Sequence, residues 1–201
     1  MGGTFNPPHF GHLLCAQEAL LAQGLDLVVW MPVNTPPHKS SAEDPGVSHR
    51  LAMCRLAVAD EPRFAVSALE AERAGASYTV DTLEALHDRA PGIELTFIVG
   101  GDMAAALPLW RDPERIVRLA RLAVAEREGH ARELILERLA MVPGATERVR
   151  FFDMPRLDVS SSLIRRRIEG GLPVRYLVPD GVVQYIEREG LYGASREGVS
   201  E

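Results

Sequence analysis

The chain opens with Gly2-Gly3-Thr4-Phe5-Asn6-Pro7-Pro8-His9-Phe10-Gly11-His12, and a run of helix-forming residues follows from Leu13 to Ala22. This order predicts a loop, rich in glycine and proline, that leads into the N-terminus of a helix. The N–H groups and the positive dipole end of such a helix attract anions. Because Gly2, Gly3 and Gly11 lack a Cβ atom, a phosphate could approach the main chain closely. We therefore expect a polyphosphate-binding loop here.

The two histidines of this loop are its chemically active side chains. His9 and His12 are three positions apart, so both imidazoles can reach one ligand if the helix begins near His9. Two other interpretations stay open on this stretch alone. His9, His12 and Cys15 follow one another at three-residue steps and could ligate zinc. The segment could also be a structural Gly-Pro turn, since it matches neither the Walker A loop nor the G-x-G-x-x-G motif.

Length and composition limit the class of protein. With 201 residues, 46% of them hydrophobic, the chain can form one well-buried domain. A net charge of −6 argues against a general nucleic-acid-binding protein. We find no membrane-spanning apolar run and no signal peptide, so we expect no membrane association. Cys15 and Cys54 are expected to be core residues rather than a disulfide, which fits a cytoplasmic protein. A homo-oligomer is possible, because composition does not determine the oligomeric state.

The basic residues are almost all of one type. The chain has 21 arginines and a single lysine, Lys39, which lies in a polar, proline-rich loop at 34–46. An ammonium group is a compact charge that can follow a phosphate, whereas a guanidinium is a planar fork. Lys39 is therefore a candidate phosphate ligand, although chance placement on a solvated loop is the alternative.

Hydrophobic patterns predict strands that alternate with helices. Strands are expected at 25–33, 63–69, 93–99, 119–125 and 149–152. Helices are expected at 13–22, after a Ser48 cap, and at 77–89, 102–107, 113–118, 130–141, 160–168 and 179–189. This order indicates an α/β fold with a doubly wound, Rossmann-like parallel sheet. We expect a single domain over residues 1–192, with a small helical C-terminal part from about 158 and a frayed tail at 193–201.

Sheets of this kind bind ligands at the carboxyl ends of their strands. The loops after the strands at 25–33 and 93–99 carry Lys39 and the Gly100-Gly101-Asp102 segment. We therefore expect Lys39, Gly100 and Asp102 to face one crevice together with the opening loop.

A phosphate-facing loop is normally preceded by a central strand, yet only Met1 stands before Gly2. Either the sheet lacks its middle strand or the sequence starts late. We favour the late start, in which Met1 is the last residue of that strand and about five to eight further residues, mostly Val, Ile, Leu and Gly, are encoded upstream in frame. Without them, the strands at 25–33 and 93–99 would lack a partner.

A second segment has the same anion-binding logic. Ser160-Ser161-Ser162-Leu163-Ile164-Arg165 places hydroxyls and N–H groups at a helix start, with an arginine one turn further on. Arginine binds phosphate bidentately. The alternative is an ordinary serine cap followed by the basic face of residues 165–167.

Together these residues resemble the H-x-G-H nucleotidyltransferase superfamily, through His9-Phe10-Gly11-His12 and Ser161-Ser162-Leu163-Ile164-Arg165. The chain resembles, more closely, bacterial nicotinate-nucleotide adenylyltransferase. The segments that carry this likeness are Gly2 to His9, Pro36-Pro37-His38-Lys39, Ser77-Tyr78-Thr79-Val80-Asp81-Thr82-Leu83, Gly100-Gly101-Asp102 and Leu107-Pro108-Leu109-Trp110. The chain departs from the pattern at Asn6, where aspartate is common, and at Arg127-Glu128-Gly129, where the family has R-P-G.

The resemblance implies transfer of AMP from ATP to nicotinate mononucleotide, with no catalytic base and with Mg²⁺ bound through the ATP phosphates. It implies that His9, His12 and Arg165 are catalytic and that ATP contacts Gly2, Gly3, Thr4, Phe5, Gly11, Lys39, Gly100, Asp102, Ser160 and Ser161. It also implies that nicotinate mononucleotide contacts Tyr78, Thr79, Trp110 and Arg127, with no metal held by the protein alone.

Three alternatives stay open. Pantetheine-phosphate adenylyltransferase shares both phosphate motifs, but segments 77–83 and 107–110 argue against it. A dual-specificity enzyme would also accept nicotinamide mononucleotide. A non-catalytic nucleotide sensor could use the same fold, although intact His9, His12 and Arg165 argue against it.

Overall fold

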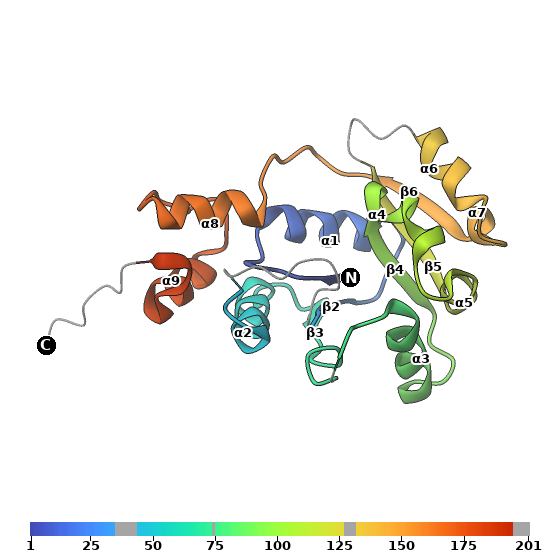
Figure 1. Cartoon of the computed structure of the whole chain (residues 1–201), viewed down its shortest axis with the longest axis horizontal. Helices are drawn as coiled ribbons and strands as arrows, with labels where there is room; N and C mark the ends of the chain where they lie inside the picture. Colours follow the sequence, from blue (N-terminus) through green and yellow to red (C-terminus); the bar gives the residue numbers. More distant parts are fainter. Residues whose placement is uncertain (35–43, 74, 127–131, 195–201) are drawn as a thin grey trace, which may run out of the picture.

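The computed structural model describes residues 1–34, 44–73, 75–126 and 132–194. Strands and helices alternate along the chain, as the sequence predicts (Figure 1). The strands are β1 Gly2–Gly3, β2 Val28–Pro32, β3 Phe64–Val66, β4 Leu95–Gly100, β5 Ala120–Glu126 and β6 Val149–Asp153. The α-helices are α1 Phe10–Ala22, α2 Val47–Ala57, α3 Thr79–Arg89, α4 Gly101–Ala105, α5 Pro113–Leu119, α6 Arg132–Leu139, α7 Ala145–Arg148, α8 Ser161–Glu169 and α9 Asp180–Glu189, and the 3₁₀ turns are η1 Leu107–Leu109 and η2 Leu191–Gly193.

The strands of the described residues form two three-stranded parallel sheets, in the orders β1-β2-β3 and β4-β5-β6. Ladder register pairs Gly2 with Met31 and Val28 with Phe64 in the first sheet. In the second, Leu95 pairs with Ala120 and Leu122 with Val149. The predicted parallel α/β fold is therefore confirmed, with its described strands divided between two sheets.

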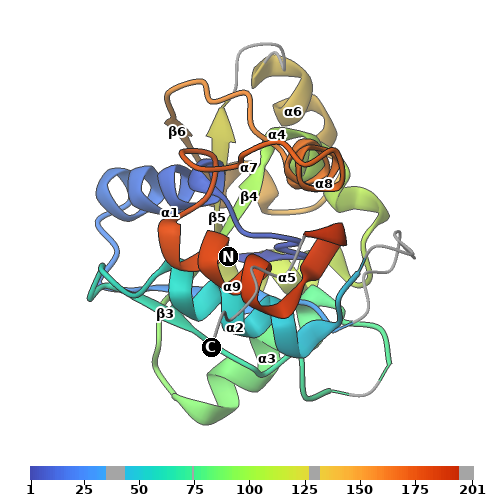
Figure 2. The ribbon, with the colours of Figure 1, turned by 90° about the vertical axis from the view of Figure 1, so that its left-hand side faces the viewer.

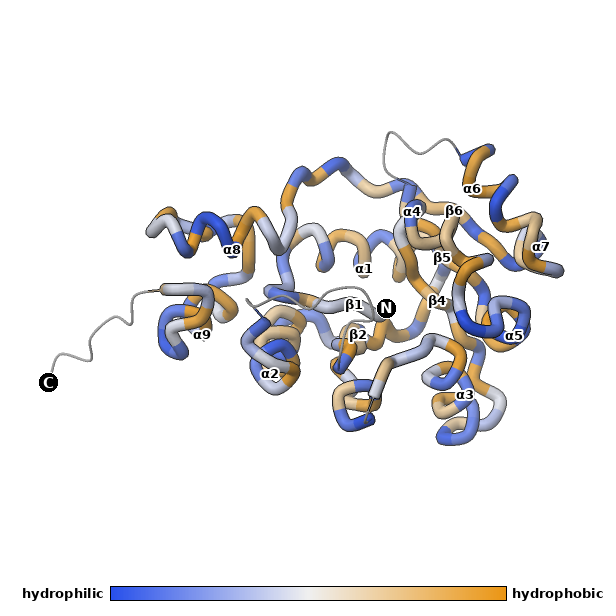
Figure 3. The backbone as a smooth tube through the Cα atoms, viewed as in Figure 1, coloured by the Kyte–Doolittle hydropathy of each residue, from blue (hydrophilic) through white to orange (hydrophobic). Residues whose placement is uncertain are grey.

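One apolar layer crosses both sheets. Helix α1 places Ala16, Ala19 and Leu20 against Trp30 of β2 and Ile98 of β4, and the same cluster continues to Ala123 and Phe152. On the opposite face, the alternate strand positions Val99, Leu122 and Val124 pack beneath α3, α5 and α6. Because successive strand residues point to opposite faces, helices cover both sides. Figure 3 shows the resulting hydrophobic interior along β4 and β5.

The C-terminal helices have a third apolar cluster of their own. Val182 and Ile186 of α9 pack with Ile164 and Ile168 of α8, and Met53 of α2 joins them. Figures 1 and 2 show α8 and α9 at the end of the molecule where α2 also lies. Helices α8 and α9 match the predicted helical C-terminal part, while the boundary near residue 158 stays a prediction.

The start of the chain differs from the prediction. Gly2 and Gly3 form strand β1 rather than part of the loop, so Met1 is not the last residue of the strand. The Met1 carbonyl accepts a hydrogen bond from the N–H of Met31, and the Gly3 carbonyl accepts one from Val33. These bonds join β1, which directly precedes the predicted phosphate-binding loop, to β2.

Between β2 and β4 lies a groove of about 320 Å³. Among the described residues no ladder joins β1 to β4. Leu27 and Val29 line the groove on one side and Leu95 and Phe97 on the other, with residues of α3 completing it. The α-amino group of Met1 is buried here and donates to the carbonyl of Val29 at 2.9 Å, and burial lowers its pKa to about 6.

Several element boundaries also need correction. Ser48 lies inside α2, whose N-cap is Gly46 at φ 97°, so the predicted serine cap is wrong. Only Val28–Pro32 of the predicted 25–33 strand is extended, because Gly24 at φ 61° and the bend after it turn the chain into β2. Helix α7 was not predicted from the sequence. The predicted tail begins too early, since Gly193 ends η2, and residues 195–201 lie outside the described part.

No helix in the described ranges combines the length and the apolar character that a membrane crossing requires.

Candidate active site

One cavity of about 690 Å³ lies at the carboxyl ends of the strands, where the sequence predicts the site. Nine of the residues predicted to bind or act on nucleotide line it: Thr4, Phe5, His9, His12, Gly100, Asp102, Ser160, Ser161 and Arg165. They come from the phosphate loop, which we define as Thr4 to His9, from α1, from the end of β4 and the start of α4, and from the first two turns of α8 with its N-cap. The structure thus brings both predicted anion-binding segments, 150 residues apart in sequence, to one place.

The two histidines lie at the start of α1. His9 is its N-cap, in an extended conformation, so the helix begins next to His9 as the sequence required. The two imidazoles stack with centroids 3.7 Å apart. The backbone N–H of His9 donates to Nδ1 of His12 at 3.2 Å. Because Nδ1 accepts this bond, a neutral His12 ring carries its proton on Nε2.

Aromatic packing holds the His12 ring from its other sides. The Phe5 ring meets it edge-on at 5.0 Å and stacks on the buried Trp30 at 4.9 Å. Phe5 is only 2% exposed and has a positive φ of 50°. A Cβ on Gly3 would lie 2.9 Å from the Phe5 ring, so glycine is required there.

Helix α8 binds the phosphate loop through its first turn. Ser160 caps the helix, as predicted, by accepting from the N–H of Leu163. The Ser161 hydroxyl donates to the carbonyl of Pro7 at 2.8 Å, and Arg165 donates to the carbonyl of Asn6 at 2.8 Å. The serines and the arginine are thus built into one wall of the cavity.

Asp102 lies in the first turn of α4, directly after β4. A Cβ built on Gly100 would stand 2.9 Å from Oδ1 of Asp102, so only glycine at position 100 leaves this carboxylate where it is. Gly11 likewise leaves room for the His9 ring. A Cβ there would lie 3.1 Å from the His9 ring and 3.2 Å from Val159. Gly2, Gly3 and Gly11 do not line the cavity themselves.

Three of the predicted nicotinate-binding residues, Tyr78, Thr79 and Trp110, do not line the cavity, and Thr79 lines the groove between β2 and β4 instead. Trp110 packs edge-on against Phe97, with ring centroids 5.8 Å apart. The Arg111 guanidinium lies 4.7 Å from the centroid of the Tyr78 ring, which joins Tyr78 to the Trp110 segment. Tyr78 is the N-cap and Thr79 the first residue of α3. Their roles in binding stay predictions.

Two predicted ligands, Lys39 and Arg127, lie outside the described residues. The zinc alternative finds no support in the part of the chain that the structure describes, where no group of three potential metal ligands was found. Cys15 packs against the apolar layer beneath α1.

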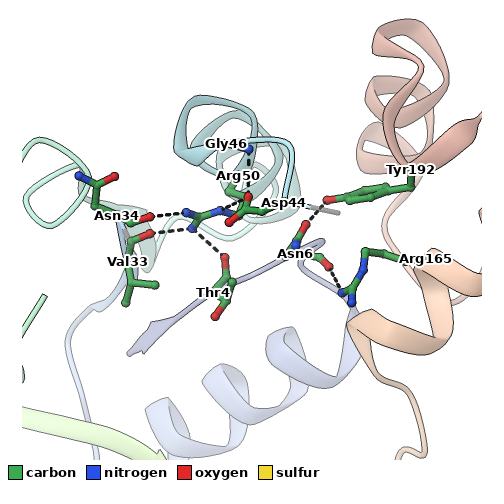
Figure 4. A network of polar contacts seen from close by, with 9 residues as sticks. All are labelled: Thr4, Asn6, Val33, Asn34, Asp44, Gly46, Arg50, Arg165 and Tyr192. Carbon is green, nitrogen blue, oxygen red and sulfur yellow. Dashed lines mark hydrogen bonds and ion pairs between the residues drawn. The ribbon is translucent and has the colours of Figure 1, made fainter. Parts of the chain in front are cut away.

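The sequence did not predict one buried residue that holds the phosphate loop in place. Arg50 is fully buried in α2 and donates to the carbonyls of Thr4 (3.0 Å), Val33 (2.7 Å) and Asn34 (2.8 Å) (Figure 4). It also forms an ion pair with Asp44 at 3.0 Å. Arg50 therefore ties the phosphate loop to the residues after β2 and to Asp44. A buried arginine is expected to be fully paired, but its pairing cannot be read from sequence.

Other unpredicted residues line the cavity itself. Asp44, Glu126 and Ser162 add polar groups to it, and Ala125, Ile135 and Val159 add apolar ones. The position of Glu126, at the carboxyl end of β5, was the signal that could have found it.

Comparison with known proteins identifies the family. The model of the cytidylyltransferase-like family matches residues 1–167. A protein of Roseiflexus sp. (strain RS-1) named "Probable nicotinate-nucleotide adenylyltransferase" is 47% identical over 194 residues, covering 96% of each chain. A protein of Geobacillus kaustophilus with the same name is 42% identical over 200 residues, covering 100% of this chain and 87% of the relative.

The solved structure of Plasmodium falciparum nicotinic acid mononucleotide adenylyltransferase complexed with NaAD aligns with a TM-score of 0.77. It covers 95% of this chain and 94% of that one, and at 19% identity it supports the fold alone. The sequence relatives, which span nearly the full length at well over a third identity, carry the assignment. On this evidence the chain belongs to the nicotinate-nucleotide adenylyltransferase family of cytidylyltransferase-like proteins.

Proposed function

We propose that this protein transfers AMP from ATP to nicotinate mononucleotide, giving nicotinate adenine dinucleotide and pyrophosphate in NAD biosynthesis. The observation that carries the proposal is the joining of His9, His12, Ser161 and Arg165 around one cavity in a member of this family. The phosphate of the mononucleotide attacks the α-phosphorus of ATP, and the bond from that phosphorus to the bridging oxygen of pyrophosphate breaks. The nucleophile is already an anion, so the site needs to position and neutralise charge rather than remove a proton.

His12 is the residue best placed to act on the α-phosphate. Its Nε2–H would donate to an α-phosphate oxygen whose charge grows in the transition state, because Nδ1 is already bonded to His9. His9 stacks on this ring and would contact the triphosphate with it. The N–H groups at the start of α1 add the positive end of a helix dipole.

The β- and γ-phosphates would lie toward α8. Arg165 would bind them and the departing pyrophosphate, with Ser160 and Ser161 beside it and Lys39 reaching in from its loop. Asp102 would accept a hydrogen bond from a ribose hydroxyl. Asp44, Asp102 and Glu126 each line the cavity but form no common metal-ligand group within the described part, so Mg²⁺ would take its oxygen ligands chiefly from the phosphates. A Mg²⁺ ion carried by the triphosphate would neutralise phosphate charge there.

Nicotinate mononucleotide would enter beside the start of α3. Trp110 would stack on the pyridine ring, and the N–H of Thr79 with neighbouring hydroxyls would donate to its carboxylate. No side chain caps the start of this eleven-residue helix, and the positive end of its dipole favours an anion. Arg127 would add a positive charge.

The test is pyrophosphate release from ATP with nicotinate mononucleotide, nicotinamide mononucleotide and pantetheine phosphate offered separately. We expect rapid release with the first, slow release with the second and none above background with the third. Equal rates with both mononucleotides would favour a dual-specificity enzyme. Nucleotide binding without release for any acceptor would favour a sensor and contradict the proposal.

A further inference from the structure

The turn η2 near the end of the described residues contacts the phosphate loop directly. The Tyr192 hydroxyl in η2 donates to Oδ1 of Asn6 at 2.5 Å, across 186 residues of sequence (Figure 4). Tyr192 has φ 57° and ψ 28°, in the left-handed region that non-glycine residues rarely adopt. Such a conformation persists only where surrounding contacts determine it. Its ring packs on the apolar cluster of α8 and α9, and burial raises the pKa of Tyr192.

Asn6 joins this tyrosine to the proposed catalytic arginine. The Asn6 side chain is only 4% exposed, and its Oδ1 accepts from Tyr192. Its backbone carbonyl accepts from Nη1 of Arg165 at 2.8 Å. Side chain and carbonyl of one residue are thus held by two separate elements, η2 and α8. A displacement of Asn6 would move the hydrogen bond that fixes one nitrogen of the planar guanidinium.

We propose that Tyr192 is a positioning residue for AMP transfer: its hydroxyl fixes Asn6 and, through the Asn6 carbonyl, the orientation of Arg165 toward the triphosphate. This inference rests on the proposed function. The bond from Nη1 to the Asn6 carbonyl, at 2.8 Å, is shorter than the contact of Nη2 with the Ser162 hydroxyl, at 3.5 Å, and it helps to set the directions of the N–H groups of this planar guanidinium. Small misplacements of a group that contacts reacting phosphates have large kinetic effects.

The hydrogen bond from the Tyr192 hydroxyl requires an acceptor oxygen in the side chain at position 6, and this side chain need not be an amide. Aspartate would accept the same bond from Tyr192, whereas leucine has a similar shape and cannot accept. The hydroxyl can also be removed separately from the ring, because Tyr192→Phe keeps the aromatic packing. These two substitutions isolate one hydrogen bond.

The experiment compares the steady-state kinetics of pyrophosphate release for Tyr192→Phe, Asn6→Leu, Asn6→Asp and the double variant Tyr192→Phe/Asn6→Leu. Tyr185→Phe is the matched control, since it removes a tyrosine hydroxyl bonded to Nδ1 of His49 at 2.9 Å in the same C-terminal region. We expect Tyr192→Phe and Asn6→Leu each to lower kcat about 10-fold, with the KM for nicotinate mononucleotide little changed. Asn6→Asp should recover most of the turnover lost in Asn6→Leu.

The double variant should be little worse than either single variant, because both remove the same interaction. A kcat for Tyr192→Phe equal to that of Tyr185→Phe would overturn the proposal, and so would losses that simply add in the double variant. If the wild-type protein transfers AMP to no acceptor, the positioning role of Tyr192 is tested by measuring ATP affinity with calorimetry. Tyr192→Phe must then bind ATP more weakly than Tyr185→Phe does. Absence of ATP binding by the wild type would overturn both proposals.

Discussion

The backbone N–H of His9 donates to Nδ1 of His12, and the two rings stack 3.7 Å apart at the first turn of α1. This bond determines which nitrogen of His12 can face a ligand. Since Nδ1 is an acceptor, Nε2 is the donor that points away from the backbone. The H-x-G-H spacing therefore does more than place two imidazoles together: it fixes the tautomer of the second.

A first prediction follows for substitutions at His12. The amide nitrogen of glutamine lies near the position of Nε2, whereas that of asparagine lies near Nδ1. His12→Gln should therefore retain a donor toward the α-phosphate and keep a kcat about 10-fold above that of His12→Asn, which corresponds to roughly one hydrogen bond. Steady-state pyrophosphate release measures both. Equal losses would show that the position of the donor nitrogen does not matter.

Gly100→Ala should impair nucleotide binding without unfolding the protein. The new Cβ would lie 2.9 Å from Oδ1 of Asp102 and displace the carboxylate proposed to bind ribose. The KM for ATP should rise about 10-fold, the cost of roughly one charged hydrogen bond. Gly181→Ala in α9 is the control, because its Cβ would meet Leu56 at an ordinary 3.7 Å. A similar KM in both variants would remove Asp102 from the binding site.

Substrate preference gives a third test. If the start of α3 presents donors to the nicotinate carboxylate, a nicotinamide would place an NH₂ group against donors. Each mismatched, desolvated group costs about 1–3 kcal/mol. The value of kcat/KM for nicotinate mononucleotide should then exceed that for nicotinamide mononucleotide by roughly 10²-fold. Thr79→Pro, which removes the N–H at a position where helices accept proline, should narrow the ratio. An unchanged ratio would place the carboxylate elsewhere.

The groove between β2 and β4 should accept an extended apolar segment. Adding about six residues of alternating Val and Gly before Met1 would extend β1 and pair it with both neighbours, at about 1 kcal/mol for each hydrogen bond formed. The melting temperature should rise by at least several degrees. A Ser-Pro extension of equal length is the control, since proline cannot donate to a ladder. Equal melting temperatures for the two extensions would contradict this use of the groove.

The same extension should change the pH dependence of stability. The Met1 amino group has a folded pKa of about 6 against an ordinary 8.0. Between these values the unfolded state binds more protons, so the free energy of unfolding rises as pH rises from about 6 to 8. The Val-Gly extension replaces the amino group by a peptide bond and should remove this contribution. Denaturant titrations between pH 6 and 8 measure the free energy of unfolding of both forms. Mass spectrometry checks that the unextended protein keeps Met1, whose amino group carries the effect.

Local signals explain what the sequence could predict. Short motifs near helix starts contain His9, His12, Ser160, Ser161 and Arg165, so their shared place at one cavity could be predicted, while their chemical roles stay predictions. Arg50 and Tyr192 carry no such signal. Arg50 lies in a helical pattern that suggests an exposed charge, and it is buried only because three carbonyls and Asp44 converge on it. Tyr192 meets Asn6 through a tertiary contact that no spacing encodes.

The division of the strands into two sheets could be predicted only in part from the sequence, for a different reason. The sequence predicted that only Met1 of the first strand was present and that the strands at 25–33 and 93–99 would lack a partner, whereas β2 pairs with both β1 and β3. It did not show that two glycines suffice to form β1, because that depends on the register with Met31 and Pro32. Strand pairing between distant residues is decided by tertiary contacts rather than by local propensity.

The most direct test of the account is the kcat of His12→Ala for dinucleotide formation from saturating ATP and nicotinate mononucleotide, measured beside the KM for ATP. Because Nε2 should stabilise charge that grows in the transition state, kcat should fall by about 10²-fold or more while the KM for ATP changes much less. Near-normal turnover in this variant would contradict the assignment of AMP transfer to this cavity.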